Sequence, residues 1–223
     1  HTAAEIHRTG LAIVPGDNLI GNQLNYAPLN GPVDNSLNHI LLSVADGTTF
    51  TKWDAGANAF LPLSVFDLNS QTWSINYSLN LGEGALVHSP ARTTNTFVGS
   101  VMVYTNIVSA MDLGPGSPWA PNYAAGLHLL ACPMPVGGSV SSMFAKVVGR
   151  APATGEWVKV LDEANQTYLT STFDGASWDH DPDLAVAHAA WFNLGPVTVP
   201  EPSALALSAG AGLVLAGARR RRR

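Results

Sequence analysis

Side chains that often do chemistry are scattered along this chain and do not form a known motif. No His-Glu-x-x-His zinc spacing, Gly-x-Ser-x-Gly elbow or phosphate-binding Gly-Lys-Ser/Thr loop occurs. The only cysteine, Cys132, lies in the apolar run LHLLACPM and is predicted to be a core thiol, because reactive cysteines need electropositive, partly exposed surroundings. The sequence therefore predicts no catalytic residue, no metal ligand and no cofactor. The histidines are His1, His7, His39, His88, His128, His180 and His188.

One acidic segment is the most suggestive local cluster. Residues 178–183 (WDHDPD) place three carboxylates close together, and carboxylate oxygens are the ligands that Ca²⁺ prefers. The matching segment that begins at Trp73 has no carboxylate, and EF-hand spacing is absent. We therefore predict a solvated acidic loop, with a calcium site as the alternative. A carboxylate pair for glycoside hydrolysis stays open, because the fold and not the sequence would bring its members together.

The charge of the chain is unevenly distributed. Five of the 11 basic residues form the C-terminal run 219–223, so the part before Pro200 has six basic and fifteen acidic residues (11 − 5 and 16 − 1), a net charge of −9. Proteins that bind nucleic acid need Lys and Arg on their folded part, so nucleic acid is not an expected partner. Few charges together with 21 Gly, 15 Pro and six Trp favour an ordered, turn-rich β protein.

The C-terminus has three parts in a fixed order: the triplet Pro200, Glu201 and Pro202, an uncharged apolar stretch at 203–218, and the arginine run. An uncharged apolar stretch can enter a bilayer, and an arginine cluster stays on the cytoplasmic side. As a helix, residues 203–218 would span about 24 Å, which is short but tolerable because arginine side chains snorkel and bilayers thin. We expect a short transmembrane helix here, with the body outside the cytoplasm.

This tail resembles the PEP-CTERM sorting signal of Gram-negative bacteria, which also goes under the name of ice-binding protein C-terminal domain. The resemblance implies that an exosortase-type membrane protease recognises Pro200, Glu201 and Pro202, and that the arginine run stops transfer. It further implies a location in the cell envelope, anchored in the membrane before processing and then at the cell surface or outside the cell. The stop residues are Arg219, Arg220, Arg221, Arg222 and Arg223.

Two further expectations concern export and ice. Export needs an apolar N-terminal signal segment, so we expect one that is missing from the sequence or already processed ahead of His1. Ice binding would need a flat, repeated threonine face. Thr48, Thr49 and Thr51 are too few to make one.

The chain before the tail matches itself, which indicates an internal duplication. Both copies contain a stretch with helical spacing, 37–44 and 140–147, preceded by a polar N-cap at Asn35 or Ser36 and at Ser139. His39 falls in the first helix and is predicted to be structural. The matched segments are 16–24 with 126–134, 57–67 with 164–174, Trp73 with Trp178, and 85–87 with 190–192.

The remaining segments favour strands and hairpins. Residues 73–79 alternate as in a half-buried strand, and 97–107 suggest a strand that is covered on both faces. The aromatic landmarks Phe66, Phe173, Trp73 and Trp178 are predicted to be mostly buried. The order of elements resembles an uncharacterised duplicated β module of bacterial surface proteins, with the landmark G-x-N-L-I-x-N at 16–22.

The predicted fold is mainly β, with two tandem pseudo-symmetric modules that each carry one short helix, plus the C-terminal membrane helix. The predicted domains are a first β module at 1–113, a linker at 114–121, a second β module at 122–199 and the sorting signal at 200–223.

The predicted function is that of an exported, non-catalytic cell-surface or extracellular-matrix protein. Two alternatives stay open. One is a polysaccharide-binding module that contacts exopolysaccharide through exposed aromatics such as Trp53, Trp119 or Trp157. The other is an envelope hydrolase whose site is invisible as a motif.

Overall fold

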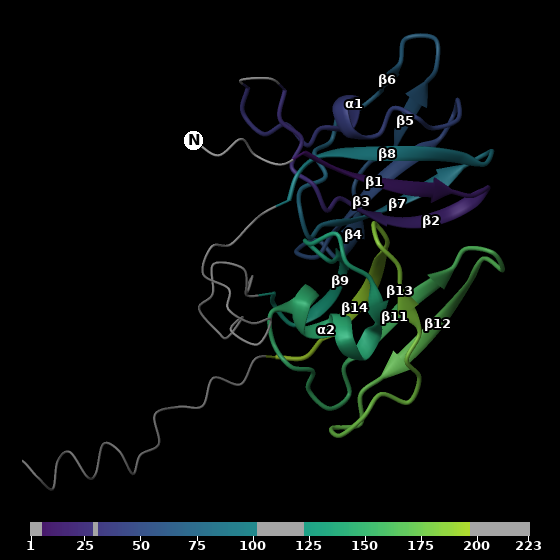
Figure 1. Ribbon diagram of the computed structural model, residues 1–223. Helices are drawn as coiled ribbons and strands as arrows, with labels where there is room; N and C mark the ends of the chain where they lie inside the picture. Colours follow the sequence, from purple (N-terminus) through teal and green to yellow (C-terminus); the bar gives the residue numbers. More distant parts are fainter. Residues whose placement is uncertain (1–5, 29–30, 102–122, 197–223) are drawn as a thin grey trace, which may run out of the picture.

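The computed structural model describes residues 6–28, 31–101 and 123–196, and it is mainly β, as the sequence predicts (Figure 1). We call residues 6–101 the first half and residues 123–196 the second half. In Figure 1 the first half runs from purple to teal, and the second half, from green to yellow, lies beside it. The predicted linker at 114–121 and the tail at 200–223 lie outside the described residues.

The first half contains one large antiparallel sheet and a two-stranded ribbon. The sheet has the strand order β2-β7-β3-β5-β6, with β4 paired to β3, and the ribbon is β1-β8. Alternation along β1 and β8 turns one side of each strand into the core, as period-two burial requires. The strands are β1 (Ile6–Ile13), β2 (Gly16–Gly21), β3 (Thr49–Asp54), β4 (Ala59–Phe60), β5 (Ser64–Asp67), β6 (Thr72–Trp73), β7 (Gly84–Ser89) and β8 (Thr93–Ser100).

The second half repeats the central part of this sheet. Its four strands have the order β12-β11-β14-β9, and β10 pairs with β13 beside them. Thus β9-β14-β11 follows the same path through the second half as β2-β7-β3 through the first. The strands are β9 (Gly126–Ala131), β10 (Gly138–Ser139), β11 (Trp157–Asp162), β12 (Thr167–Thr172), β13 (Asp183–Leu184) and β14 (Ala189–Leu194).

Single hydrogen bonds recur at matching places in the two halves. The N–H of Gly47 donates to the carbonyl of Phe66, and the N–H of Gly155 donates to that of Phe173. The ring pairs Phe66–Trp73 and Phe173–Trp178 both have centroids 5.4 Å apart. Asp54 after β3 and Asp162 after β11 are equivalent, because each carboxylate accepts the N–H groups two and three residues later. This structural register differs by one residue from the sequence match of 57–67 with 164–174.

The two predicted helices are present, but they differ in length. Helix α1 (Leu37–Ile40) stops before the predicted 37–44 stretch is complete, whereas α2 (Val140–Val148) spans the whole predicted segment. Helix α2 ends at Gly149, whose φ of +79° suits a left-handed C-cap. Ser36 and Ser139 stand at the N-cap positions, but neither side chain caps its helix. In α2 the Asp181 carboxylate accepts the N–H of Ser141 instead.

The aromatic landmarks divide between the halves. Phe66 and Trp73 are buried, as predicted, whereas Phe173 and Trp178 are only half-buried, which corrects the prediction for the second half. In the first half, the ribbon residues Leu11, Ile13 and Phe97 join Phe66 and Trp73 in one core cluster, and the Trp73 indole N–H donates to the carbonyl of Leu41. The described part of the second half has no matching ribbon.

Two strand predictions are also corrected. The expected strand at 73–79 is only the end of β6, because the chain bends after Trp73. Strand β8 is covered on one face rather than both, since its buried and less buried residues alternate up to Ser100. Residues 102–107 of that prediction lie outside the described residues.

The halves pack through reciprocal contacts. The N–H of Gly21 donates to the carbonyl of Ala187, and the N–H of Ala131 donates to that of Gly82. Isolated bridges join Ile20 to His188 and Leu130 to Glu83 in the same crossed manner. Exchanging the halves therefore exchanges one set of contacts for the other. A small apolar cluster fills the contact, made of Leu19, Leu129, Ala131, Leu161 and Ala189, with Trp53, Leu86 and Trp191 against it.

At the centre of this contact only one methyl group fits between two backbones. A Cβ built on Gly21 would lie 2.0 Å from the Cβ of Ala131, far inside van der Waals contact. Gly21→Ala is therefore expected to lower the free energy of unfolding by about 1–3 kcal/mol, the usual effect of overpacking. Urea unfolding measures it.

The matched control moves the methyl group to the other side. Gly21→Ala combined with Ala131→Gly keeps one methyl at the contact, so most of the lost stability should return. If the single variant unfolds like the wild type, or the double variant stays as unstable as the single one, the contact is not as tight as the structure indicates.

Candidate functional site

The predicted sorting residues Pro200, Glu201 and Pro202 and the arginine run lie outside the described residues. In the part of the chain that the structure describes, no helix has both the length and the apolar character that a membrane crossing requires. The candidate site in the body is therefore built from side chains at the junction of the two halves.

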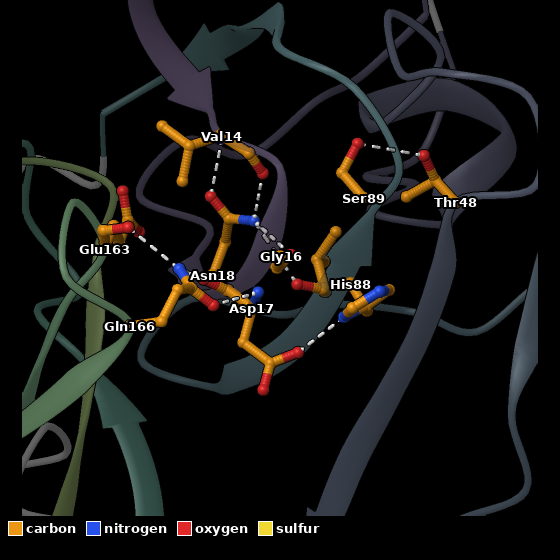
Figure 2. Close-up of polar contacts among 10 residues, drawn as sticks. Val14, Gly16, Asp17, Asn18, Thr48, His88, Ser89, Glu163 and Gln166 are labelled. Carbon is orange, nitrogen blue, oxygen red and sulfur yellow. Dashed lines mark hydrogen bonds and ion pairs between the residues drawn. The ribbon is translucent and has the colours of Figure 1, made fainter.

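The junction contains a polar network around the start of β2 (Figure 2). The Asp17 carboxylate lies 2.8 Å from Nδ1 of His88, its cross-strand partner on β7. The Asn18 side chain accepts the N–H of Val14 and donates to its carbonyl at 2.9 Å, which closes the turn between β1 and β2. This network fixes the edge of the first half that faces the second.

Gln166 joins the second half to this edge. Its Oε1 accepts the N–H of Asp17 at 2.7 Å, and its Nε2 donates to the carbonyls of Asp17 and Glu163 at 3.1 and 2.8 Å (Figure 2). The side chain lies over Gly16, where a Cβ would come within 2.5 Å of Oε1 and where φ is +96°, so only glycine fits. The amide thus holds the turn between β11 and β12 against β2.

A cavity of about 220 Å³ lies at this junction. Its apolar wall includes Leu19 of the first half and Leu161 of the second, and its polar wall includes Glu163, Asp183 and His188. The Glu163 Oε1 atom is buried and accepts no hydrogen bond, with Nε2 of His188 3.3 Å away. A titratable pair therefore borders this half-open pocket.

The state of His188 follows from its contacts. Nδ1 lies 3.0 Å from the carbonyl of Val186, which can only accept, so Nδ1 carries a proton in the neutral ring. Burial of the imidazole opposes its charged form, but the Glu163 carboxylate and the hydrogen bond to the carbonyl of Val186 together outweigh burial and raise the pKa of His188. Protonation therefore adds its proton at Nε2, on the side of Glu163.

The three carboxylates of the acidic segment 178–183 have different contacts. Asp179 accepts the N–H of Thr172 at 2.7 Å, Asp181 binds the start of α2 through Ser141, and Asp183 lines the cavity. Within the described ranges, no three His, Cys, Asp or Glu side chains gather closely enough to hold a metal ion. The segment is an exposed acidic loop whose carboxylates mostly organise the backbone.

The aromatic residues suggested for polysaccharide binding have other contacts. Nε1 of Trp53 donates to the carbonyl of Leu127 at 2.8 Å, and the Trp53 ring meets Phe60 and Trp191 edge to face, both with centroids 5.2 Å apart. This ring therefore packs between the halves. Nζ of Lys159 lies 4.8 Å above Trp157, and Trp119 lies outside the described residues.

Three further side chains have structural contacts, and for two of them, Cys132 and His39, the sequence predicts a structural role. Cys132 is buried in the second core, and burial raises the pKa of its thiol. His39 stacks on Tyr26 at 5.4 Å between ring centroids and lies 3.0 Å from the Asp34 carboxylate. His128 is buried within hydrogen-bond distance of the carbonyl of Ala124. None of these groups borders the cavity.

Sequence reasoning missed the buried carboxylate of Glu156. It forms a two-point ion pair with Arg150 and accepts the N–H groups of Ala153 and Gly195 at 2.8 and 2.6 Å. The equivalent position in the first half is Thr48, because both residues accept the N–H of the landmark Phe through their carbonyls. The difference between the copies is the signal that could have revealed it.

Sequence reasoning also missed Glu163, Gln166 and His188. Glu163 directly follows β11, whereas Gln166 and His188 directly precede β12 and β14. At each position the two halves carry different residues, so the mismatch, rather than any motif, marks the junction. No family model, no curated protein and no solved structure matches this chain.

Proposed function

We propose that this is an exported, non-catalytic protein of the cell surface or extracellular matrix, sorted through residues 200–223. The observation that carries the proposal is the order of the tail: a Pro-Glu-Pro triplet, an uncharged apolar stretch and five arginines. Strand β14 ends at Leu194, so the triplet follows the last described strand closely.

The chemistry of each part supports this role. Both prolines lack an N–H donor, and Pro202 disfavours the helical region for Glu201, so the triplet favours an extended peptide that a membrane protease of the exosortase type could enter. Residues 203–218 would bury apolar groups in the membrane, and the arginines would resist transfer. The partners proposed are therefore the membrane and its protease.

The body fits a structural role. We infer that the two halves arose from one duplicated β module, with boundaries at 1–113 and 122–199, since strand order, turn hydrogen bonds and ring pairs recur in both. The acidic surplus before Pro200 suits a secreted surface protein that must stay soluble.

The test changes Pro200, Glu201 and Pro202 to alanine in the full chain, expressed in a bacterium with an exosortase-type system. The expected result is loss of processing, with the uncleaved chain retained in the membrane fraction and the body folded as before by circular dichroism. The matched control changes residues 197–199 to alanine and should be processed normally. Normal cleavage and release of the triple variant would refute the proposal at its central residues.

A further inference from the structure

The place in the first half that is equivalent to the cavity contains two longer side chains, Trp53 and Lys52. Because the contacts between the halves are reciprocal, each residue around the cavity has an equivalent: Leu161 precedes the turn carboxylate Asp162, as Trp53 precedes Asp54. The indole of Trp53 packs against Trp191 and Phe60. The shorter Leu161 leaves open space at the equivalent place.

In the first half, the ammonium group of Lys52 lies at the place equivalent to the polar wall of the cavity. Nζ of Lys52 lies 2.6 Å from the Glu83 carboxylate and donates to the carbonyl of Ser78 at 2.9 Å. The second half has Val160 at the position of Lys52 and His188 at that of Glu83. Asp183 corresponds to Ser78, since Asp183 pairs with the N-cap residue of α2 as Ser78 pairs with that of α1. The second half thus lacks this partly exposed ammonium.

The charges that remain around the cavity favour a cation. Within the described residues the exposed Asp183 makes no ion pair, and Glu163 has a buried oxygen that faces Nε2 of His188, the basic side chain in the lining, at 3.3 Å. Asp162 also lines the cavity, but its carboxylate binds the backbone of its own turn. Buried carboxylate oxygens gain most from a charged donor.

We propose that this cavity binds a protonated primary amine carried on a short apolar stem. The ammonium takes the place that Lys52 fills in the first half, where it donates to Asp183 and, while Nε2 of His188 carries no proton, to the Oε1 atom of Glu163 that His188 faces. The stem lies against Leu19 and Leu161. At about 220 Å³ the space is below the roughly 300 Å³ of pockets for drug-sized ligands, so the ligand is small. This inference does not depend on the sorting proposal.

The probe is n-butylammonium, titrated into the whole chain and followed by NMR, with neutral n-butanol as the control of nearly the same shape. The expected result is saturable binding of n-butylammonium, with shifts at His188 and Glu163, and at least about tenfold weaker binding of n-butanol, the loss expected for a charged hydrogen bond. Asp183→Asn and Glu163→Gln should each weaken n-butylammonium about tenfold. Asp67→Asn, an exposed carboxylate remote from the cavity, should leave it unchanged.

A second variant gives the opposite test. Val160→Lys supplies the ammonium from the chain itself, as Lys52 does, and should abolish n-butylammonium binding while the thermal unfolding transition is kept. If that variant fails to fold, Leu161→Trp fills the cavity and should have the same effect. The ammonium could belong to a free small amine or to a lysine side chain of a peptide. Titration with Nα-acetyl-lysine amide, which mimics a peptide lysine, distinguishes these two sources. Whichever of the two amines binds more tightly identifies the source.

Three results would overturn the proposal. Absence of saturable n-butylammonium binding would leave the cavity without this ligand class. Equal affinity for n-butanol would show an apolar hole in which the carboxylates play no part. Binding of Ca²⁺ or glucose that depends on Asp183, without any binding of n-butylammonium, would assign the cavity to a metal ion or a saccharide.

Discussion

Glu156→Gln is expected to lower the free energy of unfolding by about 3–5 kcal/mol, because it removes one member of a buried ion pair. The Glu156 residue is 2% exposed, and both carboxylate oxygens bind Arg150 and backbone N–H groups. A neutral amide cannot balance the guanidinium and cannot accept at both ends. Urea unfolding at neutral pH measures the loss.

The pH dependence has a defined sign. Burial opposes ionisation of Glu156, but the hydrogen bonds from Arg150, Ala153 and Gly195 outweigh it and lower the pKa of Glu156 below 4.5. A carboxylate with a lowered pKa stabilises the fold above its unfolded value and loses that contribution as the pH falls through its folded value. The difference between wild type and Glu156→Gln should therefore shrink in acid.

The first half supplies the control variant. Leu42 precedes Thr48 by the same six residues that separate Arg150 from Glu156. Arg150→Leu combined with Glu156→Thr copies this uncharged arrangement and should restore much of the stability, since replacing both members of a buried pair is often near neutral. If the double variant is less stable than Glu156→Gln, the pair has a role beyond local charge balance.

Phe66→Ala is expected to cost about 3–5 kcal/mol, the usual range for removing a fully buried phenylalanine. Phe66 is 1% exposed and packs on Trp73, which in turn contacts Phe50 at 6.0 Å between ring centroids. The cavity left by the ring would lie in the core cluster that also contains Leu11, Ile13 and Phe97 of the β1-β8 ribbon, and buried neighbours limit its collapse.

The matched variant is Phe173→Ala in the second half. Each ring packs on an equivalent tryptophan, Trp73 or Trp178, at 5.4 Å between centroids. Phe173 is only half-buried, so its removal should lower the free energy of unfolding by less than half as much as that of Phe66. Urea unfolding of both variants makes the comparison. Equal losses would mean that the ribbon contributes nothing to the stability of the Phe66 site.

The sequence predicts the repeated elements well because they depend on local patterns. Helical spacing at 140–147 and the burial of Phe66 and Trp73 follow from periodicity and residue type. The failures have a common cause, which is contact from distant chain. The burial of Phe173 and Trp178 depends on whether another ribbon covers them, and the two local sequences are alike at these positions.

The candidate site was beyond sequence reasoning for a related reason. Glu163, His188 and Leu19 meet only because two sheets pack face to face, and no spacing along the chain encodes that packing. The useful signal is a difference between equivalent positions. At the cavity, the first half has Lys52 and Trp53 where the second half has the shorter Val160 and Leu161.

The single methyl group between Gly21 and Ala131 also decides which pairings are possible. If two second halves met in the same way, Ala131 would replace Gly21 and Ala189 would replace Gly84. Two methyl groups would then lie 2.0 Å apart at the first position and 2.8 Å apart at the second, closer than van der Waals contact allows. Pairing of two second halves in this geometry is therefore sterically blocked. The glycines at 21 and 84 thus restrict the contact to one first half and one second half, whether these belong to one chain or to two.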